Sequence, residues 1–411
     1  MTTQRNVAVI GAGPSGLFAA ERLASAGCRV TIYERMPAPA RKFLLAGRGG
    51  LNLTHGEPLE NFLVRYGDGD GADRVRTAIR AFPPEKLIAW ANGLGAETFV
   101  GSSGRVFPKL MKASPLLRAW LRRLDSLGVS LVTRQTWIGF DESARPSVSL
   151  GFRDAMGAES IVTPDAAILA LGGASWPKLG SDGAWVSPLR AAGVDIEPLA
   201  PSNCGVTVAW TDAFARRFAG LPLKRVAVRV GDVVHRGELM ITETGLEGGV
   251  AYALGPAIRA APKIGRASLV IDFRPGIDAA TLAVRLSRYR RGQSTSTFLR
   301  KALRLDPQSI GLLREQELPT DAASLAHRIK NVGISVTGFA GFDRAISTAG
   351  GVAATALDQT GMLRACPGVF VAGEMLDWDA PTGGYLLQAC FATAHAAADG
   401  ALAWLDGRPT A

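Results

Sequence analysis

The N-terminal segment alternates between apolar runs and a glycine-rich turn. Residues 7–10 are wholly apolar, as in a buried strand, and residues 17–26 carry apolar side chains at helical spacing. Gly27 ends this helix, and residues 29–33 form a second apolar run that leads into Glu34. A strand, a helix and a second strand in this order predict the beginning of a parallel sheet.

The same patterns predict the other elements of an α/β protein. Helical periodicity predicts helices at residues 85–94, 114–127 and 385–405. A continuous apolar run predicts a buried strand of the parallel type at residues 166–173, and short buried strands are also predicted at residues 349–355 and 369–373. Alternating apolar and polar positions predict a small antiparallel layer at residues 129–134, 136–140, 148–152 and 161–164.

A change of character in the middle of the chain predicts a second domain. Alternating strands are expected at about 195–250 and 326–338, and a helical, Arg-rich part at about 255–325. We therefore predict one nucleotide-binding domain made of residues 1–190 and 335–411. Residues 191–334 are predicted to form an inserted substrate or cap domain, part β-barrel and part helical.

Charge is the feature of the composition that bears on partners. The 411 residues carry 46 Lys and Arg against 36 Asp and Glu, which gives a net charge of +10. Such a surplus favours anionic partners, including nucleic acid. The basic side chains gather on predicted helices, where they would contact an RNA backbone or simply form a solvated face. They are Arg285, Arg288, Arg290, Arg291, Arg300, Lys301, Arg304, Arg118, Arg122 and Arg123.

Cysteine spacing and hydropathy predict that the chain has neither a metal site nor a membrane helix. The four cysteines have no CxxC spacing, so no metal site is predicted. No apolar run approaches the roughly 20 residues of a membrane helix. Because no signal-peptide pattern opens the chain, a cytoplasmic location without membrane contact is expected. The sequence predicts no particular oligomeric state.

A dinucleotide fingerprint joins the first predicted strand and helix. Gly11, Gly13 and Gly16 have the spacing Gly-x-Gly-x-x-Gly. The first glycine allows a tight turn, the second lets a pyrophosphate approach, and the third lets the helix pack close to the sheet. Pro14 and Ser15 open the helix, whose N-terminus would face the phosphates.

The end of the second strand and the C-terminal region indicate which dinucleotide binds. Glu34, followed by Arg35, would hydrogen-bond ribose hydroxyls and disfavour a 2′-phosphate. Because only one complete fingerprint is present, a single tightly held FAD is favoured over NAD. Gly172 lies in a second bare turn, which we assign to the adenosine side of the cofactor.

The last predicted strand and helix are assigned to the ribityl and flavin end. The residues concerned are Gly373, Glu374, Thr382, Gly383, Gly384 and Tyr385. Backbone N–H groups at this helix N-terminus would stabilise an anionic reduced flavin. A basic, Gly-rich loop is expected to contact the same cofactor, although it could also be a solvated loop; its candidate residues are Lys42, Arg48, Gly49, Asn52, Leu53 and Thr54.

At these residues the chain resembles a bacterial flavoprotein family that includes aminoacetone oxidase, a bile-acid enone reductase and a ribosomal RNA dihydrouridine synthase. Four stretches carry the resemblance: the fingerprint with Glu34-Arg35, residues 41–54, residues 104–108, and residues 348–352 together with 373–388. The resemblance implies a FAD-binding, Rossmann-like domain of the glutathione-reductase type. It also implies an inserted β-barrel-like domain with a helical part.

The chain departs from the family pattern at several positions. Gly50, Leu51 and Leu386 stand where the family usually has Arg, Cys and Asn. In the inserted domain, Glu243 and Glu247 replace a His and a Ser of the family's signature stretch. These changes indicate a divergent branch, whose substrate need not be that of a known member.

Three side chains are candidates for acid–base catalysis. Glu243 and Glu247, four residues apart, would bind a cationic amine or act as a general base. Alternatively, they would only stabilise the first turn of a helix. His55 would titrate near neutral pH, although a lone loop histidine is more often polar surface.

Three functions remain open on the sequence alone. The favoured one is a FAD-dependent oxidoreductase that moves hydride through flavin N5, takes it from NADH or NADPH, and reduces an enone-like C=C bond in a small molecule or in a uracil of RNA. The second is an amine oxidase of the aminoacetone type that produces H₂O₂. The third is a flavin-bearing RNA-binding module. The basic insert and the lack of an aromatic cage for an amine favour the first.

Overall fold

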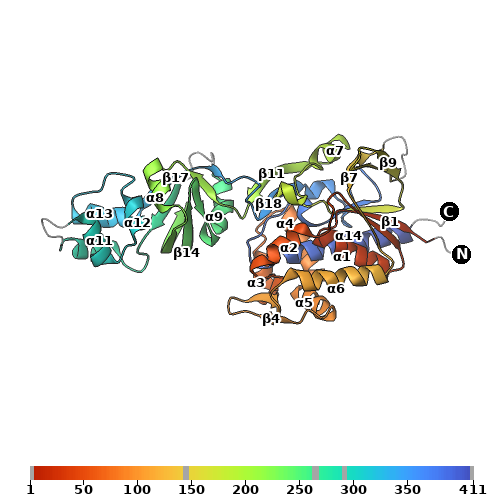
Figure 1. Cartoon of the computed structure of the whole chain (residues 1–411), viewed down its shortest axis with the longest axis horizontal. Coiled ribbons are helices and arrows are strands. Elements are labelled where there is room, and N and C mark those ends of the chain that lie inside the picture. Colours follow the sequence, from red (N-terminus) through yellow and green to blue (C-terminus); the bar gives the residue numbers. More distant parts are fainter. Residues whose placement is uncertain (1–3, 142–147, 262–267, 289–293, 408–411) are drawn as a thin grey trace. The chain divides into compact units, whose positions relative to one another are not determined.

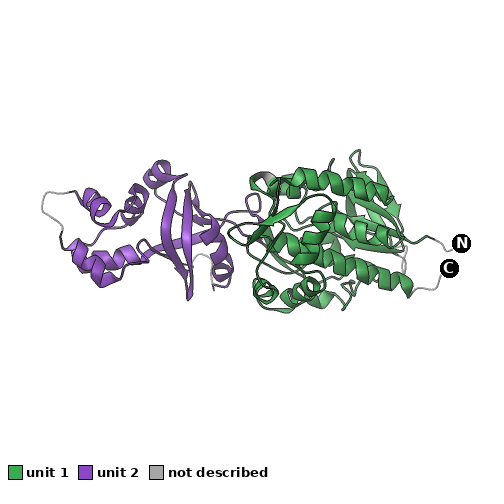
Figure 2. Ribbon diagram, turned by 90° about the horizontal axis from the view of Figure 1, so that it is seen from below, with its two compact units in different colours: residues 1–200, 347–411 green, residues 201–346 purple. Residues whose placement is uncertain are grey.

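The computed structural model describes residues 4–141, 148–261, 268–288 and 294–407, apart from the side chain of Arg48. The chain divides into two compact units, one of residues 1–200 and 347–411 and the other of residues 201–346 (Figure 2). The predicted insert, 191–334, begins and ends earlier than the second unit. Three strands set these limits. β11 (Ile196–Ser202) pairs with β18 (Ser347–Val352), which keeps most of both segments with the first unit, and β17 (Val332–Phe339) belongs to the barrel, which extends the second unit beyond residue 334.

A five-stranded parallel sheet is the centre of the first unit. Its strands are ordered β19-β10-β1-β2-β6, and every neighbouring pair is parallel. The strands are β1 (Asn6–Ile10), β2 (Arg29–Glu34), β6 (Ser130–Thr133), β10 (Ala166–Leu169) and β19 (Val369–Val371). Strands β10 and β19 are buried throughout, as their continuous apolar sequences predict.

Helices cover this sheet and close the core. α1 (Pro14–Ser25) packs against α14 (Tyr385–Asp406) and α6 (Ala113–Ser126), as Figure 1 shows. Aromatic rings fill the space between them, with Trp90 4.7 Å from Trp120 and 5.0 Å from Phe391 between ring centroids. The other helices of the unit are α2 (Arg41–Ala46), α3 (Leu59–Val64), α4 (Asp70–Ala81), α5 (Pro84–Gly93) and α7 (Val186–Ala191), with 3-10 turns η1 (Gly47–Gly49), η3 (Pro177–Leu179), η5 (Ala354–Ala356) and η6 (Gly373–Met375).

Two three-stranded antiparallel sheets stand beside the β11-β18 pair in the first unit. One has the order β3-β5-β4, and the other has the order β7-β8-β9. Their strands are β3 (Thr54–His55), β4 (Thr98–Val100), β5 (Arg105–Pro108), β7 (Gln135–Phe140), β8 (Leu150–Asp154) and β9 (Glu159–Val162). The prediction that residues 129–134 belong to this antiparallel layer is wrong. They form β6, which follows α6 directly and pairs in parallel with β2, as a strand after a crossover helix does.

The second unit is a closed barrel with added helices. The barrel order is β12-β15-β14-β13-β16-β17. The strands are β12 (Val206–Val208), β13 (Pro222–Val230), β14 (Val233–Thr242), β15 (Gly245–Glu247), β16 (Ser268–Asp272) and β17 (Val332–Phe339). The helices are α8 (Asp212–Phe218), α9 (Gly249–Arg259), α10 (Ala279–Leu286), α11 (Thr295–Leu303), α12 (Pro307–Leu313) and α13 (Ala322–Lys330).

Barrel and helices of the second unit share one apolar core. Leu223, Ile241 and Ile271 from the barrel and Leu254 and Leu299 from the helices are all fully buried in it. Strand β16 falls inside the stretch predicted to be helical, because its five residues are too few to show an alternation that stands out from their surroundings. In the part of the chain that the structure describes, no helix is long and apolar enough to cross a membrane.

Candidate cofactor site

The fingerprint glycines have three different surroundings. Gly11 has φ of 102°, and a Cβ atom there would lie 2.3 Å from the carbonyl oxygen of Ala170. A Cβ atom on Gly16 would lie 1.8 Å from the carbonyl oxygen of Gly11, so both positions exclude any side chain. A Cβ atom on Gly13 would meet nothing within 4 Å, although Gly13 begins α1. Open space before a helix N-terminus is the arrangement that accepts a pyrophosphate.

Glu34 is held in a fixed orientation beside the fingerprint. Its Oε2 atom accepts a hydrogen bond of 2.8 Å from the backbone N–H of Ala12, and Oε1 accepts one of 2.8 Å from that of Met36. Each oxygen keeps a further lone pair, so the carboxylate can still accept from a ribose hydroxyl. The neighbouring Arg35 donates from Nη1 to Asp182 Oδ2 at 2.7 Å.

A polar centre joins four segments at the carboxyl end of the sheet. Lys42 Nζ donates to Glu374 Oε2 and to Ser175 Oγ, each at 2.7 Å. The backbone N–H of Gly173 donates to the same Oε2 atom at 3.3 Å, and that of Thr348 donates to Oε1 at 3.0 Å. The ion pair of Lys42 and Glu374 therefore fixes three segments relative to one another. They are the basic loop that carries Lys42, the turn that carries Gly173 and Ser175, and the end of the last strand, which leads into Glu374.

The polar centre brings together two turns that the sequence assigns to different parts of the cofactor. The sequence pattern assigns the turn containing Gly172 to the adenosine side, and Glu374 to the ribityl and flavin side. The structure places the next residue, Gly173, in hydrogen-bond contact with Glu374, so the two turns are neighbours, and their assignment to the parts of the cofactor stays a prediction. The Gly373 turn is also next to the fingerprint helix, since a Cβ atom on Gly373 would lie 2.3 Å from Ser15 Oγ.

The loop of residues 52–54 lies directly against the turn before α14. A Cβ atom on Gly384, whose φ is 103°, would lie 2.4 Å from the backbone carbonyl group of Thr54. The hydroxyl of Thr54 and Oδ1 of Asn52 are buried and have no hydrogen-bond partner among the described residues. Leu53, by contrast, points into the hydrophobic core and is fully buried. The two unpaired polar atoms are available to a cofactor, and the contacts predicted for this loop stay a prediction.

Tyr385 anchors the start of α14. Its hydroxyl donates to Glu57 Oε1 at 2.5 Å, and Arg65 Nη2 lies 2.8 Å from Glu57 Oε2. The hydrogen bond from Arg65 lowers the pKa of Glu57, against the opposing effect of burial. Burial, followed by the hydrogen bond to Glu57, raises the pKa of Tyr385 to about 12. The phenol is therefore a neutral donor to an ionised carboxylate at ordinary pH.

His55 stacks on this tyrosine and is already engaged at both ring nitrogens. Nδ1 accepts from the backbone N–H of Glu57 at 3.1 Å, so Nε2 carries the proton and donates to the carbonyl oxygen of Ser103 at 3.0 Å. The rings of His55 and Tyr385 are 5.5 Å apart and nearly parallel. These contacts give His55 a structural role in the described residues and count against its role as an acid or base.

One interpretation of their spacing placed Glu243 and Glu247 in the first turn of a helix, but neither residue lies on a helix. Glu243 is exposed in the turn between β14 and β15, and Glu247, half-buried, pairs across the hairpin with Met240. Helix α9 begins only after them, at Gly249. Because both residues lie in the second unit, their role toward a substrate stays a prediction.

The remaining predicted cofactor residues are Pro14, in the first turn of α1; Gly49, which is exposed; and Thr382 and Gly383, which precede Gly384. Arg48 lies outside the described side chains. Sequence reasoning missed Arg41, whose Nε atom is buried without a partner, as is that of Arg35. Its place beside Lys42 in a basic loop was the available signal.

The unpaired buried atoms test whether a cofactor fits. Arg35, Arg41, Asn52 and Thr54 belong to the segment from the end of β2 to the start of β3, and each leaves a buried polar atom unsatisfied among the described residues. Native structures leave few such groups, so a polar ligand accounts for them. Together with the open space at Gly13, they define a cradle suited to a dinucleotide, which we call the cofactor cradle.

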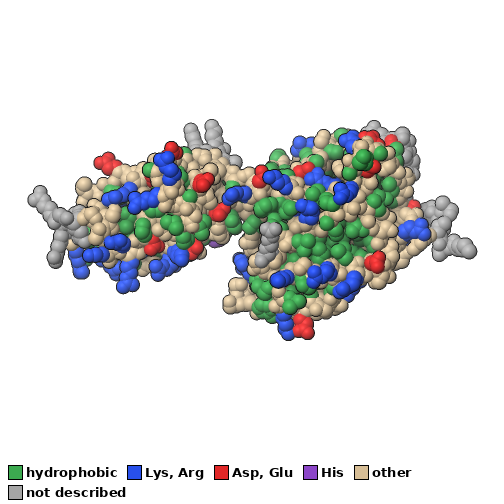
Figure 3. All heavy atoms as spheres, viewed as in Figure 1, with side chains coloured by type: hydrophobic (Ala, Val, Ile, Leu, Met, Phe, Trp, Pro, Cys, Tyr) green, Lys and Arg blue, Asp and Glu red, His purple; other side chains and the backbone are tan. Residues whose placement is uncertain are grey.

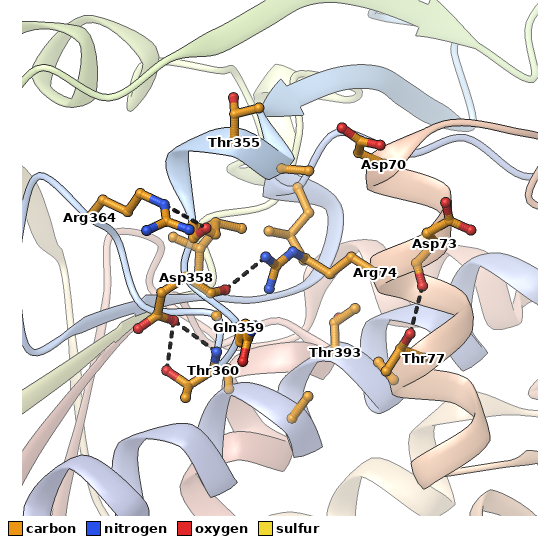
Figure 4. A pocket seen from close by; sticks show the side chains of 18 of the residues that line it. Asp70, Asp73, Arg74, Thr77, Thr355, Asp358, Gln359, Thr360, Arg364 and Thr393 are labelled. Carbon is orange, nitrogen blue, oxygen red and sulfur yellow. Dashed lines mark hydrogen bonds between the residues drawn. The ribbon is translucent and has the colours of Figure 1, made fainter.

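A separate pocket of about 590 Å³ lies elsewhere in the first unit (Figure 4). Its walls come from α4, the segment 354–364 and α14. None of the residues predicted to bind the cofactor lines it. We call it the α4–α14 pocket.

Fold and cradle are those of a FAD-dependent oxidoreductase with a Rossmann-type domain. Residues 5–400 match the family described as HI0933-like protein Rossmann domain, and the chain belongs to that family. The family resemblance found in the sequence is thus confirmed.

Relatives and solved structures agree with this class. A 3-dehydro-bile acid delta(4,6)-reductase of Clostridium scindens is 25% identical over 95% of this chain and 97% of its own. A ribosomal RNA dihydrouridine synthase of Escherichia coli is 24% identical over 96% and 97% of the two chains. The fold is similar to that of a 3-ketosteroid-Δ4-(5α)-dehydrogenase of Rhodococcus jostii, with a TM-score of 0.51, 15% identity and 97% of each chain covered.

Proposed function

We propose that the protein is an NAD(P)H-fed reductase that saturates an enone-like C=C bond in a ring compound. The observation that supports this most is the bile-acid reductase relative, which matches almost the whole length of both chains. In the balanced reaction, NAD(P)H gives a hydride to the β-carbon of the enone and a proton adds to the α-carbon. The products are NAD(P)⁺ and the saturated ketone.

The cofactor cradle supplies the residues that would hold FAD. When bound, FAD supplies a ring that takes up and passes on two electrons with a proton. Glu34 and the start of α1 would hold its ADP half, and the Gly383–Gly384 turn before α14 would lie against the other half. Lys42, fixed by Glu374 and Ser175, adds a positive charge at the carboxyl end of the sheet. The helix N-terminus at the Gly383–Gly384 turn favours a negatively charged form of the ligand.

A uracil in RNA is a second candidate acceptor. It is favoured by the relative named as a ribosomal RNA dihydrouridine synthase and by the basic surface of the second unit, seen along one edge in Figure 3. The exposed basic residues described there are Arg285, Arg288, Arg300, Lys301 and Arg304. Arg290 and Arg291 lie outside the described residues. Arg123 does not belong to such a surface, because it pairs with Glu21 at 3.0 Å.

Anaerobic reduction of the flavin tests the proposal. The absorbance band near about 450 nm should bleach on addition of NADH or NADPH and recover on addition of 4-androstene-3,17-dione. Recovery with a uridine-containing oligonucleotide alone would move the proposal to the RNA acceptor. Bleaching by aminoacetone, with none by either nicotinamide, would overturn it in favour of the amine oxidase.

Two matched lysine variants show whether the cradle carries this activity. Lys42→Met should slow bleaching by about tenfold or more, because it removes the fixed cation. Lys86→Met is the control, since Lys86 Nζ only donates to the carbonyl oxygen of Ala81 on an exposed surface. Equal rates in both variants would remove Lys42 from the site.

A further inference from the structure

The α4–α14 pocket combines an apolar floor with a polar mouth. The floor is made of buried side chains from α4, the segment 354–364, β19, the residue after η6, and α14: Ala78, Leu357, Val371, Leu376 and Ala397. Exposed polar residues surround the mouth, including Thr77, Thr355 and Thr360. Such a cavity accepts a ligand that is apolar at one end and polar at the other.

Two arginines extend into the mouth of the pocket toward the same short segment (Figure 4). Arg74, half-buried on α4, donates from Nη2 to the carbonyl oxygen of Asp358 at 2.7 Å. Arg364 donates from Nε to the carbonyl oxygen of Leu357 at 3.1 Å. Neither guanidinium forms an ion pair with a described residue. Burial lowers the pKa of Arg74, a sign that its charge lacks full compensation.

The acidic residues of the pocket compensate these charges only in part: Asp358 interacts electrostatically with both arginines but forms an ion pair with neither. Asp73 forms an ion pair of 2.5 Å with Arg76, a residue that does not line the pocket. The Oδ1 atom of Asp358 accepts from the backbone N–H of Thr360 at 2.8 Å, from its hydroxyl at 2.7 Å, and from the backbone N–H of Met362 at 3.0 Å. Asp70 is exposed in the first turn of α4, where the helix dipole favours it. Among the described residues, neither arginine of the pocket has a carboxylate within ion-pair distance.

We propose that the α4–α14 pocket binds an amphipathic organic anion, with its carboxylate or phosphate head on Arg74 and Arg364 and its hydrocarbon body on the apolar floor. Guanidinium groups bind both kinds of head through paired N–H donors. Placing the apolar body on buried Ala, Val and Leu side chains removes it from water. The proposal is independent of the reaction proposed above.

The pocket also adjoins the back of the cofactor cradle. Thr393, in the pocket wall, accepts a hydrogen bond of 3.0 Å from the backbone N–H of Gly373, at the beginning of η6. Leu376, in the floor, follows directly after η6. A ligand in the pocket would therefore contact the outer side of the turn whose inner side carries Glu374, and its binding should change the flavin absorption spectrum.

Calorimetric titration of the FAD-loaded full-length protein tests the proposal. Octanoate and octyl phosphate are the probes, and octanol and octylamine are the uncharged and cationic controls of the same chain length. We expect at least one of the two anions to bind one per chain and about tenfold or more tighter than octanol. The anion that binds identifies the head group. Failure of both, or equal or tighter binding of octanol or octylamine, would overturn the proposal.

Variants separate the arginines from general effects on the fold. Arg364→Gln, at an exposed position, and Arg74→Gln should each weaken binding of the preferred anion by about tenfold. Arg80→Gln is the matched control on α4, because Arg80 pairs with the exposed Glu60 and does not line the pocket. Ala81→Leu fills the mouth without removing charge and should also weaken binding. Unchanged affinity in Arg364→Gln and Ala81→Leu would show that the ligand binds elsewhere.

Discussion

The two units differ in how well their buried polar groups are satisfied. Every buried side-chain polar atom that lacks a partner among the described residues lies in the first unit. Four of these atoms belong to the segment from the end of β2 to the start of β3, on Arg35, Arg41, Asn52 and Thr54. In the second unit, several buried or half-buried polar side chains are hydrogen-bonded, as when Lys330 Nζ donates to Asp272 Oδ2 at 2.7 Å and to two carbonyl oxygens.

This difference indicates which unit is complete by itself. A buried polar atom without a partner costs on the order of 1–3 kcal/mol, so a cluster of them is retained only where something else satisfies it. In the first unit, a bound cofactor would supply the hydrogen bonds that these buried polar atoms lack. The second unit has a filled barrel and satisfied polar groups, so its stability should not depend on a ligand.

The strongest test of this comparison is a side chain placed in the open space at the fingerprint. Gly13→Leu should leave the unfolding temperature of the FAD-free protein unchanged, because Gly13 has φ of −78° and a Cβ atom there meets nothing within 4 Å. It should weaken FAD binding by about 100-fold, since the leucine occupies the place of the pyrophosphate. Flavin fluorescence titration and thermal unfolding measure the two effects.

The matched control lies in the second unit. A Cβ atom on Gly276 would likewise meet nothing within 4 Å, and the backbone of Gly276 is not left-handed. Gly276→Leu should therefore change neither FAD affinity nor stability. If Gly13→Leu bound FAD as tightly as the unaltered protein, the open space would not be the pyrophosphate site.

A smaller effect is expected from the unpaired hydroxyl of Thr54. Thr54→Val keeps the shape and removes the buried polar atom, so the FAD-free protein should become more stable by about 1 kcal/mol. FAD binding should weaken by about tenfold, because a hydrogen bond to the ligand is lost.

Thr207→Val is the control in the second unit. This variant should be less stable than the unaltered protein, because it loses the hydrogen bond of 2.8 Å that Thr337 Oγ1 donates to Thr207 Oγ1. Its affinity for FAD should be unchanged. Denaturant unfolding with and without FAD checks both; a loss of stability in FAD-free Thr54→Val would contradict the account.

Features that depend on particular residues at fixed separations along the chain could be predicted from the sequence. The fingerprint, Glu34 and the buried strands could be predicted because each requires particular residues at fixed separations. The Rossmann-type domain and the FAD-dependent family followed from them and are confirmed.

Contacts between distant segments could not be predicted in the same way. Lys42 meets Glu374 from the opposite end of the chain, and no local pattern encodes that pairing. For the same reason the sequence places β6 in the wrong sheet: its apolar pattern fits either layer, and only the crossover through α6 decides. The α4–α14 pocket has no sequence signal, because Arg74 and Arg364 look like ordinary surface arginines until the fold brings them together.

The smallest expected effect concerns the anchor at the start of α14 and depends on pH. Tyr385→Phe removes the hydrogen bond to Glu57 and should cost about 1 kcal/mol of stability at pH 8. The folded protein holds the Tyr385 pKa at about 12, above the ordinary value of 10.0, so the phenol's contribution is complete below pH 10 and is lost between pH 10 and 12. The stability difference between the unaltered protein and Tyr385→Phe should therefore shrink over that range in urea unfolding. Tyr33→Phe is the control without a carboxylate, because burial alone raises the pKa of Tyr33. A difference for Tyr385→Phe that stays constant from pH 8 to 12 would mean that the phenol does not depend on Glu57, and that the turn at Gly383 and Gly384 is held by packing alone.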